Sequence, residues 1–543
     1  MEQKRYIVTL TSTDDLESFY QDMECENNIS SVPARKIECC NRRPISRNTE
    51  YLLTDSEAEL LKQDPRVLAV ERVPEEVGIM PIRMFTQTET TWNKSNTNNS
   101  NHKNWGLLRC TLNEQIVNWG SNGTTSQSGT ITVNAEGRNV DVVIVDGMIN
   151  PAHPEYARNS DGTGSSRVIQ YNWFQHALGQ SSNTYIYEPY DDGNTNRTED
   201  NNHGAHVAGT VVGNTQGWAR QSNIYNINPY SSDVNETSST LLIDYIRAFH
   251  NSKPINSVTG RRNPTICNHS WGYGRALSID NITSVTVKGI TTNGPFTAGQ
   301  LNEFGIRTAT VNGTPSALVP ARVAAVDADM EDAIADGIIM VGAAGNDGTK
   351  IDTIGGEDFN NSFIWNGNTF SYHRGSTPGV SGNTICVGAI GSLANESKAT
   401  FSNCGARVDV YAPGENIKSS FNSTTSFGGV DDPRNGDFKI GKISGTSMAS
   451  PQVCGILACV LEIYPNMTQA EAIEYIKFYA KKDQITDTEG GFTDLTSLQG
   501  SANNYLFYFE ERLNSGNVFP KQNNKSRPQS GAVYPRTNIR RKG

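Results

Sequence analysis

Residues 444–451 read Ser444-Gly445-Thr446-Ser447-Met448-Ala449-Ser450-Pro451, a run of small residues that leads into an apolar segment. In that segment apolar residues recur at intervals of three and four, which predicts a helix with one buried face: Val453, Ile456, Leu457, Val460 and Ile463. Pro451 is expected in the opening turn of this helix, where its missing N–H removes no hydrogen bond. Ser447 would then lie at the helix N-terminus, where unpaired N–H groups can hold a developing oxyanion.

Ser447 has two interpretations at this point. A serine at the start of a helix is commonly an N-cap, whose side-chain oxygen accepts a backbone N–H. It can also be a nucleophile, but a serine nucleophile requires a base to take its proton and a third group to orient that base. The neighbouring Ser444 and Ser450 are interpreted as structural. The nucleophile hypothesis therefore depends on a histidine and a carboxylate elsewhere in the chain.

A candidate carboxylate follows an apolar run upstream. The segment NVDVVIVDG at 139–147 predicts a parallel strand that is buried on both faces. Asp146 stands at the carboxyl end of this strand, which is the end where sites form in open α/β sheets. Asp141 opens the same strand and is interpreted as a pairing or capping carboxylate.

A candidate histidine lies in a second run of small residues, NHGAHVAGT at 202–210. The run predicts the start of a helix led by His203. His206 lies three residues further on, near the same face of that helix. A histidine within a helix of small residues is usually structural, so spacing alone leaves both histidines as candidates.

These segments resemble the signature blocks of the subtilisin-like serine proteases, in that family's order of Asp, His and Ser: Asp146-Gly147, His203-Gly204-Ala205-His206-Val207-Ala208-Gly209-Thr210 and Gly445-Thr446-Ser447-Met448-Ala449-Ser450-Pro451. Two further blocks deepen the resemblance. One is a strand and turn at 337–348 that contains Asn346, and the other comprises the segments 399–405 and 411–414. Five blocks in the family's order argue against a chance match.

The resemblance implies a fold and a set of roles. The fold would be α/β, with a mostly parallel, helix-covered sheet preceded by a small α+β pro-domain. Ser447 would be the nucleophile, His203 the base and Asp146 the group that orients the base. His206 would be a buried companion, and Asn346 would supply the oxyanion hole.

The resemblance also assigns candidate substrate-binding residues. Ser270-Trp271-Gly272 resembles the strand that lines the family's primary specificity pocket, although Trp271 could equally be a core aromatic residue. The chain departs from the family at Gly147, where serine or threonine is usual. This departure is expected to loosen the hydrogen bonding around Asp146.

The domain organisation follows from the order of the predicted elements. Residues 1–80 predict an α+β unit, with strands at 6–10, 51–53 and 67–71, a helix at 13–23 capped by Thr13, and a helix at 56–63. This unit is similar to the family's inhibitory pro-segment, and the alternative is an unrelated N-terminal binding domain. A polar linker at 81–104 precedes a catalytic domain at 105–512.

Two segments extend beyond a compact member of the family. An insertion at about 273–318 lies beside the proposed pocket, so it could shape substrate access, but the favoured interpretation is a solvated hairpin of uncertain role. Residues 513–543 form a basic tail, which predicts either disorder or docking onto an anionic partner.

Composition excludes several classes of protein. The net charge of -11 argues against a nucleic-acid partner, and the absence of eighteen consecutive apolar residues argues against a membrane partner. The N-terminus has no apolar region of signal-peptide length, so cytoplasmic synthesis is favoured. Nine scattered cysteines without a Cys-x-x-Cys pair favour buried free thiols over a disulfide framework.

The resemblance implies no cofactor for the chemistry, whereas a structural calcium ion is allowed because calcium binding is frequent in the family. Hard oxygen ligands suit calcium, and acidic loops occur at Asp191-Asp192 and Glu199-Asp200. Acidic loops are usually only solvated, and no metal ligands are assigned.

The leading hypothesis is a serine endopeptidase made as a zymogen, which acts on protein or peptide substrates and carries its own pro-segment as an intramolecular inhibitor. One alternative is a catalytically silent member of the fold that serves as a structural or binding protein. Another is a lipase-like esterase, which the absence of a Gly-x-Ser-x-Gly elbow argues against.

Overall fold

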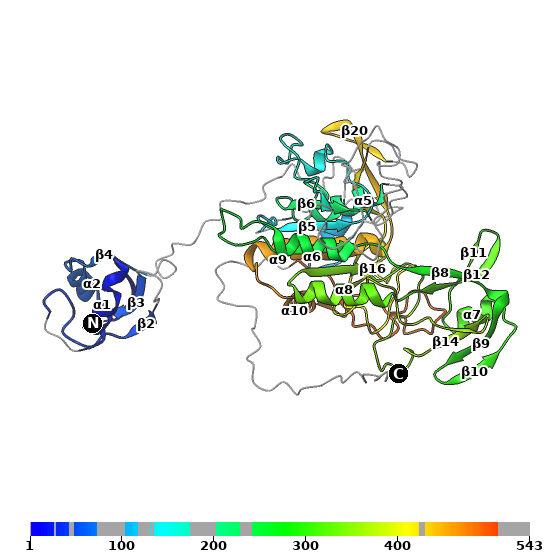
Figure 1. Cartoon of the computed structure of the whole chain (residues 1–543). Helices are drawn as coiled ribbons and strands as arrows, with labels where there is room; N and C mark the ends of the chain where they lie inside the picture. The colour runs from blue at the N-terminus through cyan, green and yellow to red at the C-terminus, as the bar shows by residue number, and fades with distance from the viewer. Residues whose placement is uncertain are drawn as a thin grey trace, which may run out of the picture. The chain divides into compact units, whose positions relative to one another are not determined.

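The computed structural model describes residues 2–25, 29–42, 48–72, 104–117, 127, 131, 135–173, 202–228, 242–422 and 429–508 (Figure 1). The chain divides into two compact units, Met1–Met84 and Phe85–Gly543. The predicted linker, apart from Asn104, and the predicted basic tail lie outside the described residues.

The N-terminal unit is a four-stranded antiparallel sheet with two helices. Its strands follow the order β2-β3-β1-β4, with bounds Cys39–Arg42, Asn48–Leu53, Lys4–Leu10 and Val67–Arg72. The helices are α1 (Leu16–Glu24) and α2 (Asp55–Leu61), and α2 begins with a capping box between Thr54 and Glu57. The sequence did not predict β2. The Thr13 cap was also wrong, because residues Thr13–Asp15 form a short 3-10 turn before α1.

An eight-stranded sheet organises the second unit, in the order β21-β22-β17-β16-β13-β7-β5-β6. All neighbouring strands pair in parallel except β21 and β22. The bounds in that order are Lys481–Lys482, Asn504–Tyr505, Val410–Pro413, Ile385–Ile390, Ile339–Ala343, Thr265–His269, Asp141–Val145 and Asn223–Ile227.

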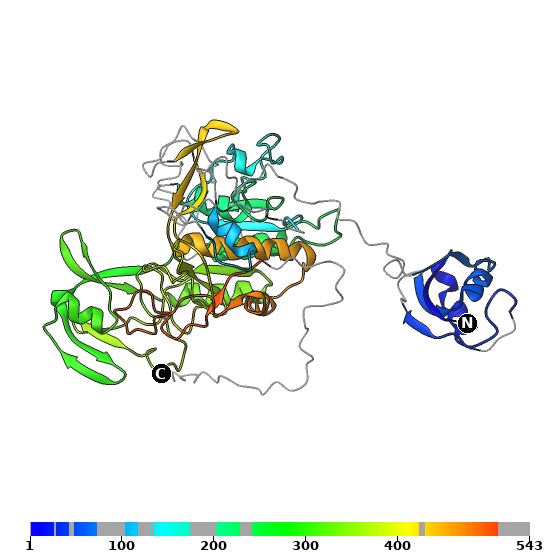
Figure 2. The same ribbon diagram turned by 180° about the vertical axis from the view of Figure 1, so that it is seen from behind.

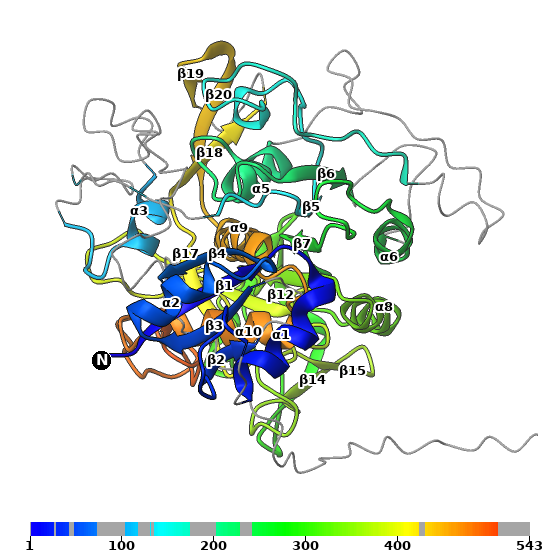
Figure 3. The ribbon, with the colours of Figure 1, turned by 90° about the vertical axis from the view of Figure 1, so that its left-hand side faces the viewer.

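Helices cover both faces of this sheet, as Figure 3 shows. One buried apolar cluster joins alternate strand residues to α5 (His203–Val212) and α9 (Thr446–Ile463), together with α3 (Trp105–Thr111) and α10 (Gln469–Tyr479). The residues between them on β5, β7 and β13 face a second cluster with α6 (Leu242–Ser252) and α8 (Ala324–Ala335). The predicted α/β fold is therefore confirmed.

The helix α9 is long and strongly apolar, and its first sixteen residues are buried. By length and composition alone, this helix of 18 residues could cross a membrane, but 89% of it is buried inside the fold. Its apolar composition is explained by its position as a core helix packed on the sheet.

The predicted insertion is a structured subdomain and not a solvated hairpin. It contains β8 (Gly274–Ser278), β9 (Ile282–Val287), β10 (Ile290–Asn293), α7 (Ala298–Glu303), β11 (Thr308–Val311) and β12 (Thr314–Pro320). These strands form the sheets β11-β12-β8 and β10-β9-β14-β15, and the latter recruits β14 (Ser362–Trp365) and β15 (Asn368–Ser371). Figures 1 and 2 show these elements gathered to one side of the large sheet. They share a buried core, which a solvated hairpin would lack.

A further small antiparallel sheet lies against α5. It consists of β18 (Ile417–Phe421), β20 (Asn435–Ile443) and β19 (Val430–Asp432), with β20 in the centre. The strand β18 packs on α5, so this sheet contacts the helix that begins with His203.

Candidate active site

Three predicted site segments lie at one edge of the large sheet. Asp146 directly follows β5, Ser270 directly follows β7, and Asn346 follows β13 after a two-residue turn. These three strands are neighbours in the sheet and run parallel, so their carboxyl ends lie together. The helix α9, which carries Ser447 in its first turn, packs across β7 and β13. The fold thus gathers residues separated by about 300 positions in the sequence.

Asp146 and His203 are in direct contact. The Nδ1 of His203 lies 2.8 Å from Oδ1 of Asp146, and the same oxygen accepts the Gly147 N–H at 2.8 Å. The close approach depends on Gly204, because a Cβ at that position would lie 2.1 Å from the Gly147 carbonyl oxygen. Asp146 is fully buried, whereas 26% of the His203 side chain is exposed. The imidazole therefore bridges a buried anion and the surface.

His206 has a different environment. It is fully buried, and its Nε2 contacts the Ile417 carbonyl oxygen at 2.8 Å. Burial lowers the pKa of His206 to about 3, so the ring stays neutral over the ordinary pH range. This environment agrees with a structural companion, and among the described residues it is His203 that contacts Asp146.

Asp141 is paired within the sheet. Its carboxylate accepts from Lys253 Nζ at 2.8 Å and from the side-chain amides of Asn223 and Asn263 at 2.8 and 3.0 Å. The predicted pairing role is thus supported by its contacts.

Ser447 is the second residue of α9, so its N–H has no carbonyl partner within the helix. Its hydroxyl donates to the Ser270 carbonyl oxygen at 3.0 Å. The hydroxyl proton of Ser447 is therefore directed at the Ser270 carbonyl oxygen.

Pro451 lies deeper in the helix than the sequence predicted. Because α9 begins at Thr446, Pro451 is its sixth residue, and its missing N–H leaves the Ser447 carbonyl without a helical partner. The Ser270 hydroxyl donates to that carbonyl at 3.0 Å. The same hydroxyl accepts from the Asn268 amide, and Asn268 in turn accepts from Ser450 at 2.7 Å. Ser450 therefore has a structural partner, and the two backbones beside Ser447 are joined by side chains.

Asn346 is held by the turn that precedes Ser447. Its Oδ1 accepts the backbone N–H of Thr446 at 2.8 Å and the Thr446 hydroxyl at 2.9 Å. Its amide nitrogen faces the same turn, since a Cβ on Gly445 would lie 3.4 Å from Nδ2. With its oxygen occupied in this way, Asn346 presents its amide as a donor beside Ser447.

The predicted substrate-binding residues line a cavity of about 410 Å³. Ser270, Trp271 and Gly272 form one part of the lining, and Asn346 and Ser447 form another. Trp271 also packs against the apolar cluster of α6 and α8, with its ring 5.3 Å from that of Tyr273. The two interpretations of Trp271 are thus compatible, because the residue contributes to both the core and the pocket.

The start of α5 is fixed to β18. The Ala205 carbonyl oxygen accepts the hydroxyls of Tyr156 and Ser420 at 2.8 and 2.9 Å. Asn202, which precedes His203, accepts the Asn422 N–H at 2.7 Å through its side chain. These bonds hold the turn from which the imidazole projects.

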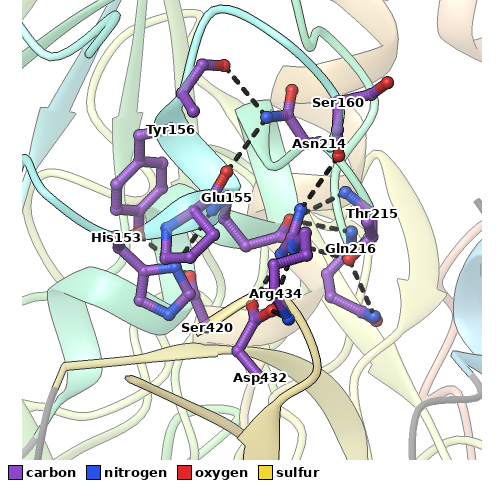
Figure 4. Close-up of polar contacts among 12 residues, drawn as sticks. His153, Glu155, Tyr156, Ser160, Asn214, Thr215, Gln216, Ser420, Asp432 and Arg434 are labelled. Atoms are coloured by element: carbon purple, nitrogen blue, oxygen red, sulfur yellow. Dashed lines mark hydrogen bonds and ion pairs between the residues drawn. The ribbon is translucent and has the colours of Figure 1, made fainter. Parts of the chain in front are cut away.

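The end of α5 is fixed by a second polar cluster, shown in Figure 4. The buried Glu155 carboxylate accepts the backbone N–H groups of Thr215 and Gln216 at 2.8 and 3.0 Å. It also accepts the Thr215 hydroxyl and the guanidinium of Arg434, which pairs with Asp432 at 2.6 Å. Because Arg434 lies between β19 and β20, this cluster ties the small sheet to the segment that follows α5.

No metal site is assigned from the parts of the chain that the structure describes. Within them, no group of three or more His, Cys, Asp or Glu side chains could hold an ion. The acidic loops at Asp191-Asp192 and Glu199-Asp200 lie outside the described residues.

Sequence reasoning missed two features of this region. One is the structured form of the insertion, which was expected as a solvated hairpin although β8 and β12 supply part of the cavity lining. The other is Asp347, which lines the cavity directly after Asn346. The adjacency of Asp347 to a predicted site residue was a usable signal, but the direction of its side chain was not readable from the sequence.

Comparison with known proteins places this geometry in context. The profile of the subtilase family matches residues 137–501, well over half of the chain. "Subtilisin-like protease 8" of Trichophyton verrucosum is 25% identical over 314 residues, which cover 55% of this chain and 47% of that protein. "Alkaline serine exoprotease A" of Vibrio alginolyticus is 23% identical over 351 residues, which cover 64% of this chain and 47% of that protein.

The chain spans about half the length of the curated relatives it matches. Among solved structures, the "Crystal structure of a cold adapted subtilisin-like serine proteinase" aligns with 75% of this chain and 98% of its own. That alignment has 20% identity and a TM-score of 0.43.

Proposed function

The chain belongs to the subtilase family, and on that basis we propose that it is a serine endopeptidase that acts on proteins or peptides. The observation that carries the proposal is the contact of His203 with the buried Asp146, at one edge of a sheet where Ser447 and Asn346 line a common cavity. A buried carboxylate that fixes one imidazole nitrogen leaves the other nitrogen to act on a hydroxyl.

In the first half of the reaction, the Ser447 oxygen attacks the carbonyl carbon of the peptide bond. His203 takes the hydroxyl proton on Nε2, and Asp146 stabilises the resulting imidazolium through Nδ1–H. When the tetrahedral intermediate collapses, the C–N bond breaks and His203 gives the proton to the leaving amine. The acyl group remains on Ser447 as an ester.

In the second half, a water molecule replaces the amine. His203 removes a proton from this water, whose oxygen attacks the ester carbonyl. The ester bond breaks, the Ser447 oxygen recovers the proton from His203, and the carboxylate product leaves.

The oxyanion of each intermediate would be held by the Ser447 N–H and the Asn346 side-chain amide. Removing one such donor costs roughly 2.7–4 kcal/mol of transition-state stabilisation, a range known for subtilisin, a member of the same family. We therefore expect Asn346→Ala to lower kcat by about 10²- to 10³-fold and to change KM little. Steady-state kinetics on a peptide substrate measure both constants, and an unchanged kcat would exclude Asn346 from this role.

A serine-directed fluorophosphonate tests the nucleophile directly. The wild type should become labelled on Ser447, whereas Ser447→Ala should not. Ser450→Ala is a matched control, because Ser450 lies on the same helix and bonds to Asn268. Labelling that persists in Ser447→Ala would discard the assignment. A wild type that folds but takes no label would favour the catalytically silent alternative.

We also propose that the N-terminal unit is an inhibitory pro-segment and that the protein is made as a zymogen. The support is the compact α+β unit at Met1–Met84, which precedes the family domain. Self-processing should then release this unit by a cut within 81–104. Mass spectrometry of wild type and Ser447→Ala tests this, since the cut should occur only in the wild type. A single uncut wild-type mass, in a protein that cleaves peptides, would contradict the zymogen proposal.

A further inference from the structure

Part of the wall of the cavity beside Ser447 is formed by the insertion and not by the large sheet or its helices. The insertion contributes Ala276 from β8 and Leu318, Val319 and Pro320 from β12. Ala343 of β13 adds to the same lining. The space between these aliphatic groups suits the unbranched methylene stem of a long side chain, which buries well along apolar surface.

One carboxylate lies in this lining. Asp347 directly follows Asn346, and its position is fixed by the backbone, since its N–H donates to Asn403 Oδ1 at 3.1 Å. The next residue, Gly348, has a positive φ of 65° and accepts the Arg307 guanidinium at 3.0 Å through its carbonyl. The turn that carries Asp347 is therefore held at both ends.

The Asp347 carboxylate has no counterpart within the protein. Among the residues that the structure describes, none donates a hydrogen bond to it and none forms an ion pair with it. Burial alone raises the pKa of this carboxyl, with no contribution from a neighbouring charge. A half-buried anion that lacks a donor is costly, and a cation brought into the cavity would offset that cost.

The cavity has one other charged lining residue, Arg275. Its side chain is exposed, and its guanidinium lies 5.4 Å from the centre of the Phe370 ring on β15. The guanidinium is thus engaged with the small sheet β10-β9-β14-β15. The carboxylate remains the unpaired charge of the cavity.

We propose that this cavity selects substrates with lysine or arginine on the acyl side of the cleaved bond, with the insertion holding the stem and Asp347 pairing with the cation. This inference rests on the proposed protease function and names its substrate class. Asp347 would set specificity and would take no part in bond breaking.

The test uses fluorogenic peptide amides that differ only at the residue before the cleaved amide, which is lysine, arginine, norleucine or glutamate. Norleucine has an unbranched stem like that of lysine but carries no charge. In the self-processed wild type, kcat/KM for lysine should exceed that for norleucine by about tenfold, the ratio expected from a half-buried charge pair. Asp347→Asn should bring this ratio close to one.

Two controls keep the result specific. Asp280→Asn removes an exposed carboxylate of the same insertion that does not line the cavity, and it should leave the ratio unchanged. Arg275→Gln tests the opposite selection. If glutamate were cleaved best in the wild type and this preference disappeared in Arg275→Gln, the cavity would select anions and the proposal would be overturned.

Failure of the inference is separable from failure of the protease function. A wild type that takes fluorophosphonate on Ser447 but cleaves the norleucine peptide as well as the lysine peptide overturns the inference alone. The same holds if Asp347→Asn keeps the lysine preference. A wild type that takes no fluorophosphonate overturns the protease function, and the inference falls with it.

Discussion

Asp146 and Glu155 are both fully buried carboxylates near α5, but their partners differ. Asp146 accepts two hydrogen bonds, both through Oδ1, and no described residue donates to its Oδ2. Glu155 accepts four, and both of its oxygens are occupied. One carboxylate is thus incompletely satisfied and the other is saturated.

The identity of the charged partner differs as well. Asp146 contacts an imidazole, which can gain and lose a proton near neutral pH, and that imidazole reaches the surface. Glu155 contacts a guanidinium, which is permanently charged and only 13% exposed. The first arrangement suits a charge that changes during a reaction, whereas the second suits a fixed structural bond. The spare Oδ2 of Asp146 also agrees with the loosened hydrogen bonding expected from Gly147.

The largest expected effect is on the first carboxylate. Asp146→Asn keeps the shape of the side chain but removes its charge, so the imidazole loses both its orientation and its counterion. We expect kcat to fall by about 10⁴-fold, with a small change in melting temperature. Kinetics on a peptide amide and thermal unfolding measure the two quantities on one preparation. A kcat close to that of the wild type would remove Asp146 from the catalytic assignment.

The second carboxylate should show the reverse pattern. Arg434→Met leaves Glu155 and Asp432 buried without their cation, which is expected to lower the free energy of unfolding by roughly 3–5 kcal/mol. Activity measured well below the melting temperature should stay within a few-fold of the wild type. Lys439→Met is the matched control, because its pair with Asp431 is exposed on the same sheet and should contribute less than about 1 kcal/mol. Equal losses in both variants would mean that burial does not distinguish the two pairs.

A smaller effect concerns Glu155, whose contribution to the free energy of unfolding is expected to depend on pH. Burial by itself raises the pKa of Glu155, but the Arg434 charge and the Thr215 hydrogen bonds outweigh it and lower that pKa to about 2, against 4.5 for a free glutamate. The folded state therefore binds fewer protons than the unfolded state between these values. The stabilisation is complete above pH 4.5 and is lost as the pH falls toward 2.

Glu155→Gln should therefore differ from the wild type in unfolding free energy by a constant amount above pH 4.5. That difference should shrink by about 3 kcal/mol on acidification toward pH 2. Urea unfolding at a series of pH values measures it, and Glu357→Gln, at an exposed ion pair, serves as the control. A difference that does not change with pH would show that the Glu155 pKa is not lowered on folding.

Local patterns in the sequence were sufficient for much of the fold. The apolar run before Asp146, the small-residue start of α5 and the three-and-four spacing of α9 each predict an element from neighbouring residues, and the α/β fold is confirmed. The roles of Asp146, His203, Asn346 and Ser447 stay predictions, although the structure brings Asp146 into contact with His203.

The remaining features depend on contacts between distant residues, which no local pattern encodes. Glu155 and Arg434 are 279 positions apart. The insertion recruits β14 and β15 from residues 362–371 to complete its sheet. The sequence therefore placed the insertion beside the pocket but could not show that it forms part of the lining.

The position of Pro451 has a mechanical consequence for the molecule. An unbroken helix would satisfy the Ser447 carbonyl internally, and the helix could then shift along the sheet without losing that bond. Here the carbonyl depends on the Ser270 hydroxyl, while the Ser447 hydroxyl depends on the Ser270 carbonyl. Two hydrogen bonds thus join the strand end that lines the cavity to Ser447, the residue proposed as the nucleophile. A displacement of this strand end would therefore be transmitted to Ser447.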